Sequence, residues 1–231
     1  MMLKMYDLAG AEADRRFSPY CWRIKMSLAH KGLAIETIPW RFTEKDVIAF
    51  SGQGLVPVLL DGEREVHDSW TIAEYLEEKY PDRPSLFGGA SGRALSLFHA
   101  SWANGFLQPA MMKFVVLDIW KHADAKDKAY FRESREKRLG KTLEAAVAHR
   151  DSEVTGFRDS LLPLRLALSA QPFLGGEKPL YADYAIFGSF QWCRCISDFQ
   201  LLAPDDPIYA WRGRMLAHHD GLAGKAKGYP V

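Results

Sequence analysis

Ser18 lies in a segment whose residue types could stabilise an anion. The run Phe17-Ser18-Pro19-Tyr20-Cys21 stands where an apolar stretch gives way to a helical pattern. Serine is a preferred N-cap and proline is favoured in the first helical turn, so we expect a helix to begin here. The free N–H groups and the dipole of a helix N-terminus favour negative charge, including that of a thiolate. The segment predicts an anion site at Ser18, although a purely structural cap would use the same residues.

Two further segments could bind a peptide-like ligand. Val56-Pro57 lies in an apolar strand, where proline cannot donate to the ladder. A bulge or an edge strand would explain this proline, but a cis bond before it would turn the N–H and C=O of Val56 toward a ligand. Asp68-Ser69 precedes a helical pattern and could simply cap it. Alternatively, this helix end could bind the carboxylate of an α-amino acid while Asp68 takes its ammonium group.

The elements that must position these segments change in character along the chain. Alternating strand patterns at 3–8, 34–40, 56–60 and 65–67, with helices at 18–32 and 69–80, predict a βαβ-ββα unit with a hairpin turn at Asp61-Gly62. Beyond Pro84 only helical patterns follow. We therefore expect an α/β thioredoxin-like domain over residues 1–82 and an all-α bundle over 90–231. Within the bundle, Gly105 and Pro109 indicate a break or kink. The stretch 126–150 can bury a stripe of Phe131, Leu139, Leu143 and Val147, and its charge is interpreted as a solvated helix face.

Composition excludes several classes of protein. The formal net charge is +1, without the basic excess typical of nucleic-acid binding. No apolar run approaches the roughly 18 residues that span a bilayer, and the first residues lack a signal-peptide core. Three cysteines do not make a disulfide framework, so we expect a reducing cytoplasm. Cys193 and Cys195 face different sides of a helix and His218-His219 lacks ligand spacing, which predicts no metal site.

Together these segments resemble the cytosolic glutathione transferases, from Leu3 to about Ala217. The resemblance rests on Val56-Pro57-Val58-Leu59, on the run from Asp68 to Leu76, and on Phe173-Leu174-Gly175-Gly176 through Ala182-Asp183. Ser18 through Leu33 is similar to serine-type bacterial enzymes related to β-aryl etherases. Trp22-Arg23 is also similar to the zeta class, which includes maleylacetoacetate isomerases. One residue departs from the family pattern: Leu180 stands where a serine or threonine usually caps the helix of Asp183.

The resemblance implies a role for each site residue, with glutathione as co-substrate and a homodimer as the assembly. Ser18 would hydrogen-bond the glutathione sulfur, and Val56, before a cis Pro57, would pair with the cysteinyl backbone. Asp68 and Ser69 would hold the γ-glutamyl end. The remaining candidates are Lys45 and Gln53 for the glycyl carboxylate, and Tyr20 for the hydrophobic substrate site. Trp102, Phe106, Met111 and Phe114 are further candidates for that site, although ordinary bundle core is the favoured interpretation of these four.

Serine at position 18 narrows the chemistry. Glutaredoxins have Cys-Pro-Tyr-Cys here, whereas Ser18 cannot form the mixed disulfide of thiol–disulfide exchange. Cys21 is then interpreted as a structural residue, with peroxide sensitivity as the alternative. Serine is a poor base, but lowering a thiol pKa of about 8.5 by roughly two units needs about 3 kcal/mol. A charge-assisted hydrogen bond of about 1.5–3 kcal/mol and a helix end of about 0.3–1 kcal/mol supply that.

The predicted function is conjugation of glutathione to a small hydrophobic electrophile. Two other activities remain open, namely glutathione-dependent β-aryl ether cleavage and glutathione-dependent isomerisation. A non-catalytic protein that binds glutathione or another ligand is the alternative outside enzymes. We expect neither a nucleic-acid nor a membrane partner.

Overall fold

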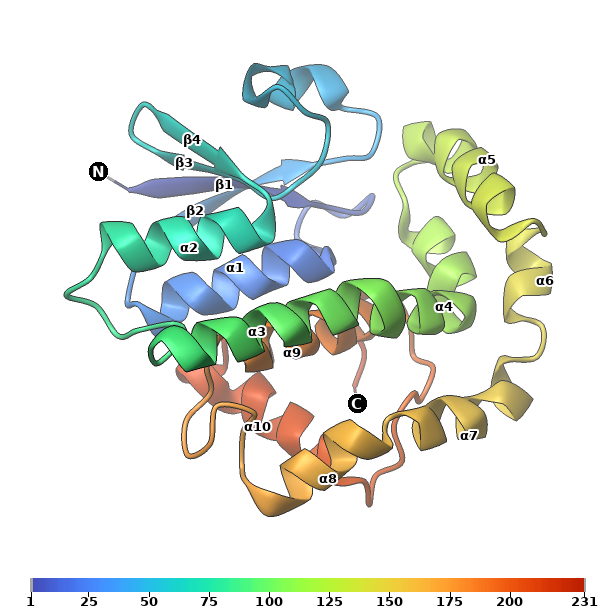
Figure 1. Ribbon diagram of the computed structural model, residues 1–231. Helices are drawn as coiled ribbons and strands as arrows, with labels where there is room; N and C mark the ends of the chain where they lie inside the picture. The colour runs from blue at the N-terminus through green and yellow to red at the C-terminus, as the bar shows by residue number, and fades with distance from the viewer. Residues whose placement is uncertain (1, 231) are drawn as a thin grey trace.

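The computed structural model describes residues 2–230, and Figure 1 shows how their elements are arranged. No helix in this part of the chain is long and apolar enough to cross a bilayer. The elements in chain order are β1 (Leu3–Leu8), α1 (Pro19–His30), β2 (Ile35–Trp40), η1 (Lys45–Ser51), β3 (Val58–Asp61), β4 (Arg64–His67), α2 (Ser69–Lys79), α3 (Ala90–Trp102), η2 (Ala103–Leu107), α4 (Gln108–His122), η3 (Ala125–Asp127), α5 (Lys128–Leu139), α6 (Leu143–Val147), α7 (Arg150–Ser160), α8 (Leu162–Ala170), α9 (Tyr181–Ile196) and α10 (Pro207–Gly221).

The first part of the chain forms a four-stranded mixed sheet in the order β2-β1-β3-β4. β1 and β2 are parallel and joined through α1, whereas β3 is antiparallel to both β1 and β4. Leu3 and Met5 alternate with more exposed neighbours along β1, as expected for a strand with one buried face. α1 and α2 lie side by side against the sheet (Figure 1). The predicted βαβ-ββα unit and the all-helical remainder are both confirmed.

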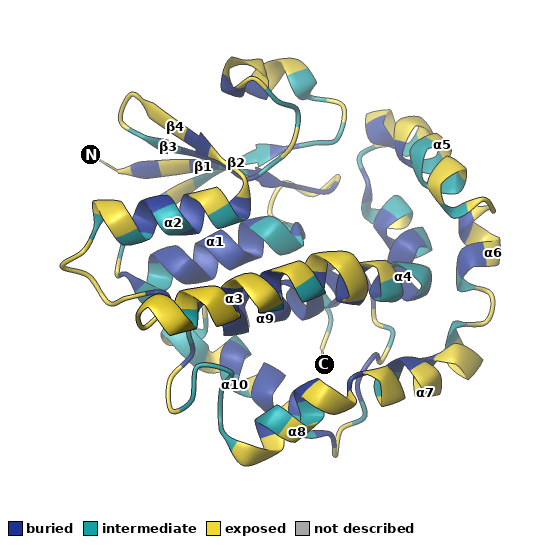
Figure 2. Cartoon of the chain, viewed as in Figure 1, coloured by how far each residue is buried: buried dark blue, intermediate teal, exposed yellow. Residues whose placement is uncertain are grey.

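α9 is the centre of the helical part. Every residue of this helix except Arg194 is buried, and its main partner is α1 of the sheet unit. Figure 2 shows both helices in the colour of buried residues at the middle of the molecule. Because α9 is covered on all sides, Cys193 and Cys195 are both buried although they face different directions. The site end of α1 is therefore held by the most buried helix of the fold.

The structure makes two expectations about the helices more specific. Residues 126–150 form two helices and the start of a third, because Gly140 adopts a left-handed φ of 67° and ends α5. Near Gly105 and Pro109 the expected break or kink is a π-helical turn at 103–107, through which the chain remains helical from α3 to α4. There the N–H of Gln108 bonds to the carbonyl of Ala103, and the wider turn accommodates the proline.

A chain of titratable side chains joins α1, α9 and α10. His30 Nδ1 lies 2.7 Å from the hydroxyl of Tyr184, which lies 3.1 Å from His219 Nε2. The ring centroids of His218 and His219 are 4.4 Å apart. Burial lowers the pKa of His30 and His218, and it lowers the pKa of His219 to about 4 with help from the other two histidines. The folded protein therefore favours the neutral forms of these histidines.

Stability should fall as the pH drops from 7 toward 4. An unfolded histidine titrates near 6.5, so between about 4 and 6.5 the unfolded chain binds more protons than the folded one, which favours unfolding. His219→Asn should reduce the difference between the free energies of unfolding measured in urea at pH 7 and pH 5. Asparagine suits the left-handed backbone at this position. His99→Asn, on the exposed face of α3, is the control, and an equal difference in both variants would contradict the prediction.

Candidate functional site

Ser18 is the N-cap of α1. Its backbone is extended (φ −61°, ψ 125°), and its Oγ accepts the N–H of Cys21 at 3.2 Å. The side chain is almost fully buried. Because Oγ accepts from the helix, its own proton remains free to donate to a group outside the helix. The local sequence thus orients the Ser18 hydroxyl as a donor at the positive end of α1.

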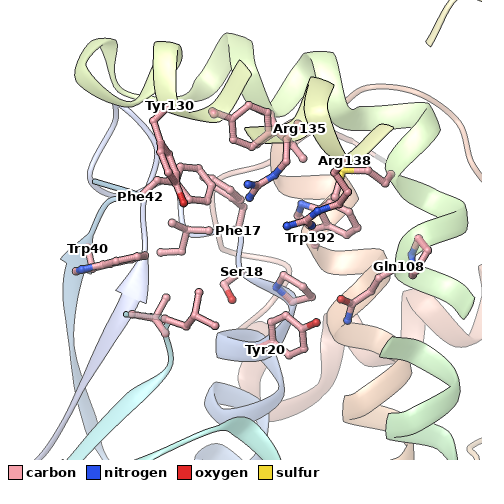
Figure 3. Close-up of a pocket in the computed structure, with 18 of the residues that line it drawn as sticks. Phe17, Ser18, Tyr20, Trp40, Phe42, Gln108, Tyr130, Arg135, Arg138 and Trp192 are labelled. Carbon is pink, nitrogen blue, oxygen red and sulfur yellow. The ribbon is translucent and has the colours of Figure 1, made fainter. Parts of the chain in front are cut away.

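A cavity of about 560 Å³ opens above Ser18. Its walls come from the start of α1, the loops around β2 and β3, and the helices α4, α5 and α9 (Figure 3). Four predicted site residues belong to this wall, namely Ser18, Tyr20, Lys45 and Val56. The other lining residues are Leu8, Phe17, Pro19, Trp40, Phe42, Leu55, Asn104, Gln108, Pro109, Met112, Ile119, Tyr130, Phe131, Arg135, Arg138, Leu139 and Trp192.

The Val56–Pro57 peptide bond is cis, which the proline alone left open and the family resemblance implied. Val58 pairs with His67 in the β3–β4 ladder, so continuing the register brings Pro57 next to Asp68. Asp68 has a left-handed φ of 66°, which is costly for a residue other than glycine. The strand register therefore places Asp68 and Ser69 beside the cis bond, outside the wall of the cavity.

The side chain of Asp68 has a structural role at this turn. Its Oδ1 accepts the N–H groups of Trp70 and Thr71, both at 3.0 Å, and so caps α2. Ser69 is buried, and its carbonyl accepts the hydroxyl of Tyr181 at 3.1 Å. The contact joins the starts of α2 and α9. The hydrogen bonds within residues 2–230 use only Oδ1 of Asp68, which leaves Oδ2 available to an ammonium group.

Lys45 and Gln53 lie differently from each other. Lys45 Nζ donates to the carbonyl of Gly54 and lies 4.8 Å from the centroid of the Trp40 indole. Burial lowers the pKa of Lys45. The amide of Gln53 is engaged within its own loop, where Oε1 accepts the N–H of Leu55 at 2.6 Å and Nε2 donates to the Leu55 carbonyl at 2.9 Å. Gln53 is therefore not part of the cavity wall.

The expected apolar walls need correction. Met111 and Phe114 have no exposed surface, and Phe114 stacks on Phe199 in the core with ring centroids 5.7 Å apart. Trp102 and Phe106 stack on each other, with centroids 5.5 Å apart, away from the cavity. α3, η2 and α4 form one continuous helical segment, and the face of it that reaches the cavity carries Asn104, Gln108 and Met112 instead. A different helix face thus lines the cavity.

α5 contributes a wall of the cavity that the sequence did not predict. Tyr130, Phe131, Arg135 and Arg138 lie in the stretch that was interpreted as a solvated face. The only signal in the sequence is their spacing, which places them on one side of a helix. The aromatic lining of the cavity is completed by Trp40, Phe42 and Trp192, which no local sequence motif predicted.

Cys21 is part of the core. Its thiol has no exposed surface and lies 3.9 Å from the carbonyl of Tyr6. Burial raises the pKa of the Cys21 thiol well above its usual value. A buried, protonated thiol is a poor nucleophile, which favours the structural interpretation over peroxide sensitivity.

Trp22 and Arg23 position α1. Trp22 Nε1 donates to the carbonyl of Arg16 at 2.8 Å. The buried Arg23 donates to the carbonyl of Ala185 on α9 at 3.2 Å and to Asn104 Oδ1 at 2.8 Å. Arg23 thereby links α1, α9 and the cavity wall.

Gly188 lets α9 approach the start of α1. A Cβ at this position would lie 2.4 Å from the carbonyl oxygen of Pro19 and 3.2 Å from Cγ of Arg23. Since a contact of 2.4 Å is too short, any side chain at 188 would displace the helix end that carries Ser18. The glycine is thus a geometric requirement of the site.

Gly188→Ala should destabilise the fold by about 1–3 kcal/mol, as is typical of overpacking, and should weaken ligand binding at Ser18. Gly213→Ala on α10 is the matched control, because its Cβ meets nothing within 4 Å and alanine favours a helix. Urea unfolding of both variants tests the prediction. Equal stability of the two variants would contradict a close contact between α9 and α1.

Comparison with known proteins agrees with this geometry. The family model of the glutathione S-transferase N-terminal domain matches residues 13–84, and the model of the C-terminal domain matches residues 94–201. This chain belongs to the cytosolic glutathione S-transferase superfamily. The two matches cover Ser18, the sheet unit apart from β1, and the helices that form the rest of the cavity.

The chain is similar to several individual members of the superfamily. It is 31% identical to a glutathione S-transferase zeta class protein of Euphorbia esula, over 41% of this chain and 46% of that protein. It is 32% identical to glutathione S-transferase Z1 of Arabidopsis thaliana, over 46% of this chain and 50% of that protein. These matches span about half the length of the curated relatives.

The fold is also seen in solved structures. The crystal structure of the glutathione S-transferase CsGST63524 of Ceriporiopsis subvermispora, in complex with glutathione, superposes with a TM-score of 0.76. The sequences are 22% identical, and the match covers 97% of this chain and 94% of the other. The expected fold of the superfamily is therefore confirmed. The subtype suggested by Ser18 and Trp22-Arg23 stays a prediction.

Proposed function

We propose that this protein is an enzyme that binds glutathione and activates its thiol for attack on an electrophile. The observation that carries the proposal is the Ser18 hydroxyl, which caps α1 through Cys21 and belongs to the wall of a cavity. Membership of the superfamily supports glutathione as the co-substrate. Ser18 would donate a hydrogen bond to the thiolate, while the N–H of Cys21 polarises the hydroxyl.

The rest of glutathione would extend from Ser18 toward α2. The backbone of Val56, beside the cis Pro57, would pair with the cysteinyl residue of the ligand. The γ-glutamyl end would bind at Asp68 and Ser69, with Oδ2 of Asp68 taking the ammonium group and the helix end taking the carboxylate. Lys45 would leave the Gly54 carbonyl to bind the glycyl carboxylate. Gln53 stays outside this arrangement, because its amide is engaged in its own loop.

The reaction needs no other base. The thiol proton passes to solvent on binding, and the sulfur lone pair forms a bond to the electrophilic carbon. The leaving group then departs with its bonding electrons. Ser18 is neither the nucleophile nor a base, and its contribution is to keep the sulfur charged.

Glutathione-dependent isomerisation is the second candidate activity. It is favoured by the zeta-class names of two relatives and by Trp22-Arg23. Both activities begin with the same thiolate, so both depend on Ser18. β-Aryl ether cleavage would use the same nucleophile against an ether carbon.

We also propose that the protein works as a homodimer in the cytoplasm. Leu95 and Phe98 leave 60% and 65% of their surfaces exposed on α3, which Figure 2 shows as an exposed helix. Apolar side chains gathered on one helix face are typical of a contact between proteins. The molar mass in solution, measured by light scattering, tests the assembly.

Calorimetry with glutathione and S-methylglutathione tests the proposed function. We expect both ligands to bind the wild type with micromolar to millimolar affinity. Measured near pH 7 in buffers of different ionisation enthalpy, glutathione should release a large part of one proton, because its thiol ionises on binding. S-methylglutathione has no thiol and should release much less. Absence of glutathione binding, or equal proton release by the two ligands, would contradict the proposal.

A further inference from the structure

The cavity has a one-sided distribution of charge. Three cationic residues, Lys45, Arg135 and Arg138, belong to its wall, and within residues 2–230 no aspartate or glutamate does. The charge of Asp127, outside the wall, acts on Lys45, while its carboxylate accepts the N–H groups of Phe42 and Thr43 at 2.9 and 3.0 Å. The wall itself therefore offers no carboxylate to Arg135 and Arg138.

The two arginines come from α5, which carries five cationic residues. Arg132 forms ion pairs with Glu136 and Glu144, each at 2.8 Å. Arg135 and Arg138 form no ion pair with any residue of the described chain, and Figure 3 shows both side chains extending into the cavity from the side opposite Ser18. Lys128 and Lys137 have no ion pair among the described residues either, but only the two arginines belong to the cavity wall.

Arg135 is also held in place. Its guanidinium lies 4.7 Å from the ring centroid of Phe131 and 5.5 Å from that of Phe42, and it donates to Ser134 Oγ at 3.0 Å. Its buried Nε has no hydrogen-bond partner in the part of the chain that is described. Burial, together with the charge of Arg138, lowers the pKa of Arg135. An anion beside this side chain would relieve both effects.

Glutathione, placed as above, does not supply that anion. Its thiolate lies at Ser18, its glycyl carboxylate at Lys45 and its γ-glutamyl carboxylate at the start of α2. Arg135 and Arg138 remain, and they share the cavity with the aromatic rings of Tyr130 and Trp192. This wall therefore suits a ligand that combines an aromatic ring with a negative charge.

We propose that the electrophilic substrate is an aromatic acid, whose acidic group binds Arg135 and Arg138 while its ring packs among the aromatic side chains of the cavity. This inference rests on the proposed function and deepens it. Guanidinium groups match the geometry of carboxylates and sulfonates, and the rings supply apolar contact for the body of the substrate. The thiolate at Ser18 would attack a ring carbon or a carbon attached to the ring. A carbon–sulfur bond forms, and the leaving group departs with its bonding electrons.

Two probes that differ only in charge test the substrate class: 4-chloro-3,5-dinitrobenzoate and its amide. Glutathione displaces chloride from both. With rates divided by the uncatalysed rates, the wild type should have a kcat/KM for the acid at least about 10-fold above that for the amide. Added salt should raise KM for the acid and leave KM for the amide nearly unchanged.

Arg135→Gln and Arg138→Gln should each remove most of the preference for the acid and change the rate with the amide less than about 3-fold. Lys137→Gln, which removes an exposed charge from the same helix, is the control and should keep the preference. Arg138 is exposed, so its variant keeps the test valid if Arg135→Gln folds poorly. An equal rate with both probes in the wild type, or an equal loss with both in the arginine variants, would overturn the proposal.

The calorimetric test separates this inference from the proposed function. In both arginine variants we expect glutathione to bind and release its proton as in the wild type. Loss of glutathione binding in Arg138→Gln would show that this arginine serves glutathione and would overturn the inference. Failure of the wild type to bind glutathione would instead contradict the proposed function.

Discussion

Replacing Ser18 by alanine is expected to lower kcat/KM for conjugation about 10- to 150-fold. The variant loses one hydrogen bond to a charged sulfur, of about 1.5–3 kcal/mol, and 1.36 kcal/mol corresponds to a factor of ten in rate. The affinity for glutathione should change only a few-fold, because the contacts proposed for Val56, Asp68 and Ser69 remain. Steady-state kinetics with the amide probe, together with calorimetry, give both quantities.

Ser27→Ala is the matched control for this substitution. Ser27 lies on the same helix, is equally buried and donates to the carbonyl of Arg23 at 2.8 Å, but it does not reach the cavity. Both variants should lose a similar, small amount of stability, since the cap at Ser18 contributes about 1 kcal/mol. Equal activity of Ser18→Ala and Ser27→Ala would contradict the role of Ser18 as a donor to the thiolate.

Asp183→Ala should destabilise the fold by about 3–5 kcal/mol. The carboxylate of Asp183 accepts four hydrogen bonds: the N–H groups of Leu174, Gly175 and Leu180 at 2.8, 2.9 and 3.0 Å, and Nε1 of Trp211 at 2.9 Å. Alanine leaves all four donors in a buried place without an acceptor. Because α9 packs on α1, the substitution should also disturb the start of α1 that carries Ser18.

Two further variants make the measurement specific. Asp183→Asn can keep the two bonds to Oδ1, but its amide group would face the N–H groups of Gly175 and Leu180, so we expect an intermediate loss. Asp205→Ala removes an exposed carboxylate and should change the free energy of unfolding by less than about 0.5 kcal/mol. A loss for Asp183→Ala no larger than for Asp205→Ala, in urea unfolding, would contradict this account.

Leu180 shows how the structure resolves a departure from the family pattern. The usual hydroxyl cap is absent, but Asp183 accepts the N–H of Leu180 and the carbonyl of Leu180 accepts the N–H of Asp183 at 2.9 Å. The helix is thus capped by Asp183 and the backbone alone. The helix start therefore does not need the missing serine, whose hydroxyl would have satisfied only one donor.

The features that the sequence predicted well are local ones. Ser18-Pro19, Asp61-Gly62 and Gly32 each determine a turn or a helix end from a few adjacent residues, and the structure has these boundaries. Strand alternation in the first 80 residues sufficed for the sheet unit. The same local signals placed Ser18 at a helix N-terminus, which is the basis of the proposed chemistry.

The cavity could not be predicted in the same way because it depends on how helices are rotated in the bundle. Trp102 and Phe114 are large and apolar, as substrate walls often are, yet Trp102 stacks on Phe106 and Phe114 stacks on Phe199, away from the cavity. Arg135 and Arg138 belong to a charged stretch that is typical of solvent-exposed helices, and only the placement of α5 over Ser18 turns them inward. No short-range pattern carries that information.

The most direct test of the central claim is the pKa of the glutathione thiol in the complex. Ultraviolet absorbance of the thiolate, followed against pH with the protein in excess, gives this value for the wild type and for Ser18→Ala. We expect the bound thiol to titrate roughly two units below the usual value of about 8.5 in the wild type, and close to that value in Ser18→Ala. A wild-type complex in which the thiol titrates like free glutathione would contradict it.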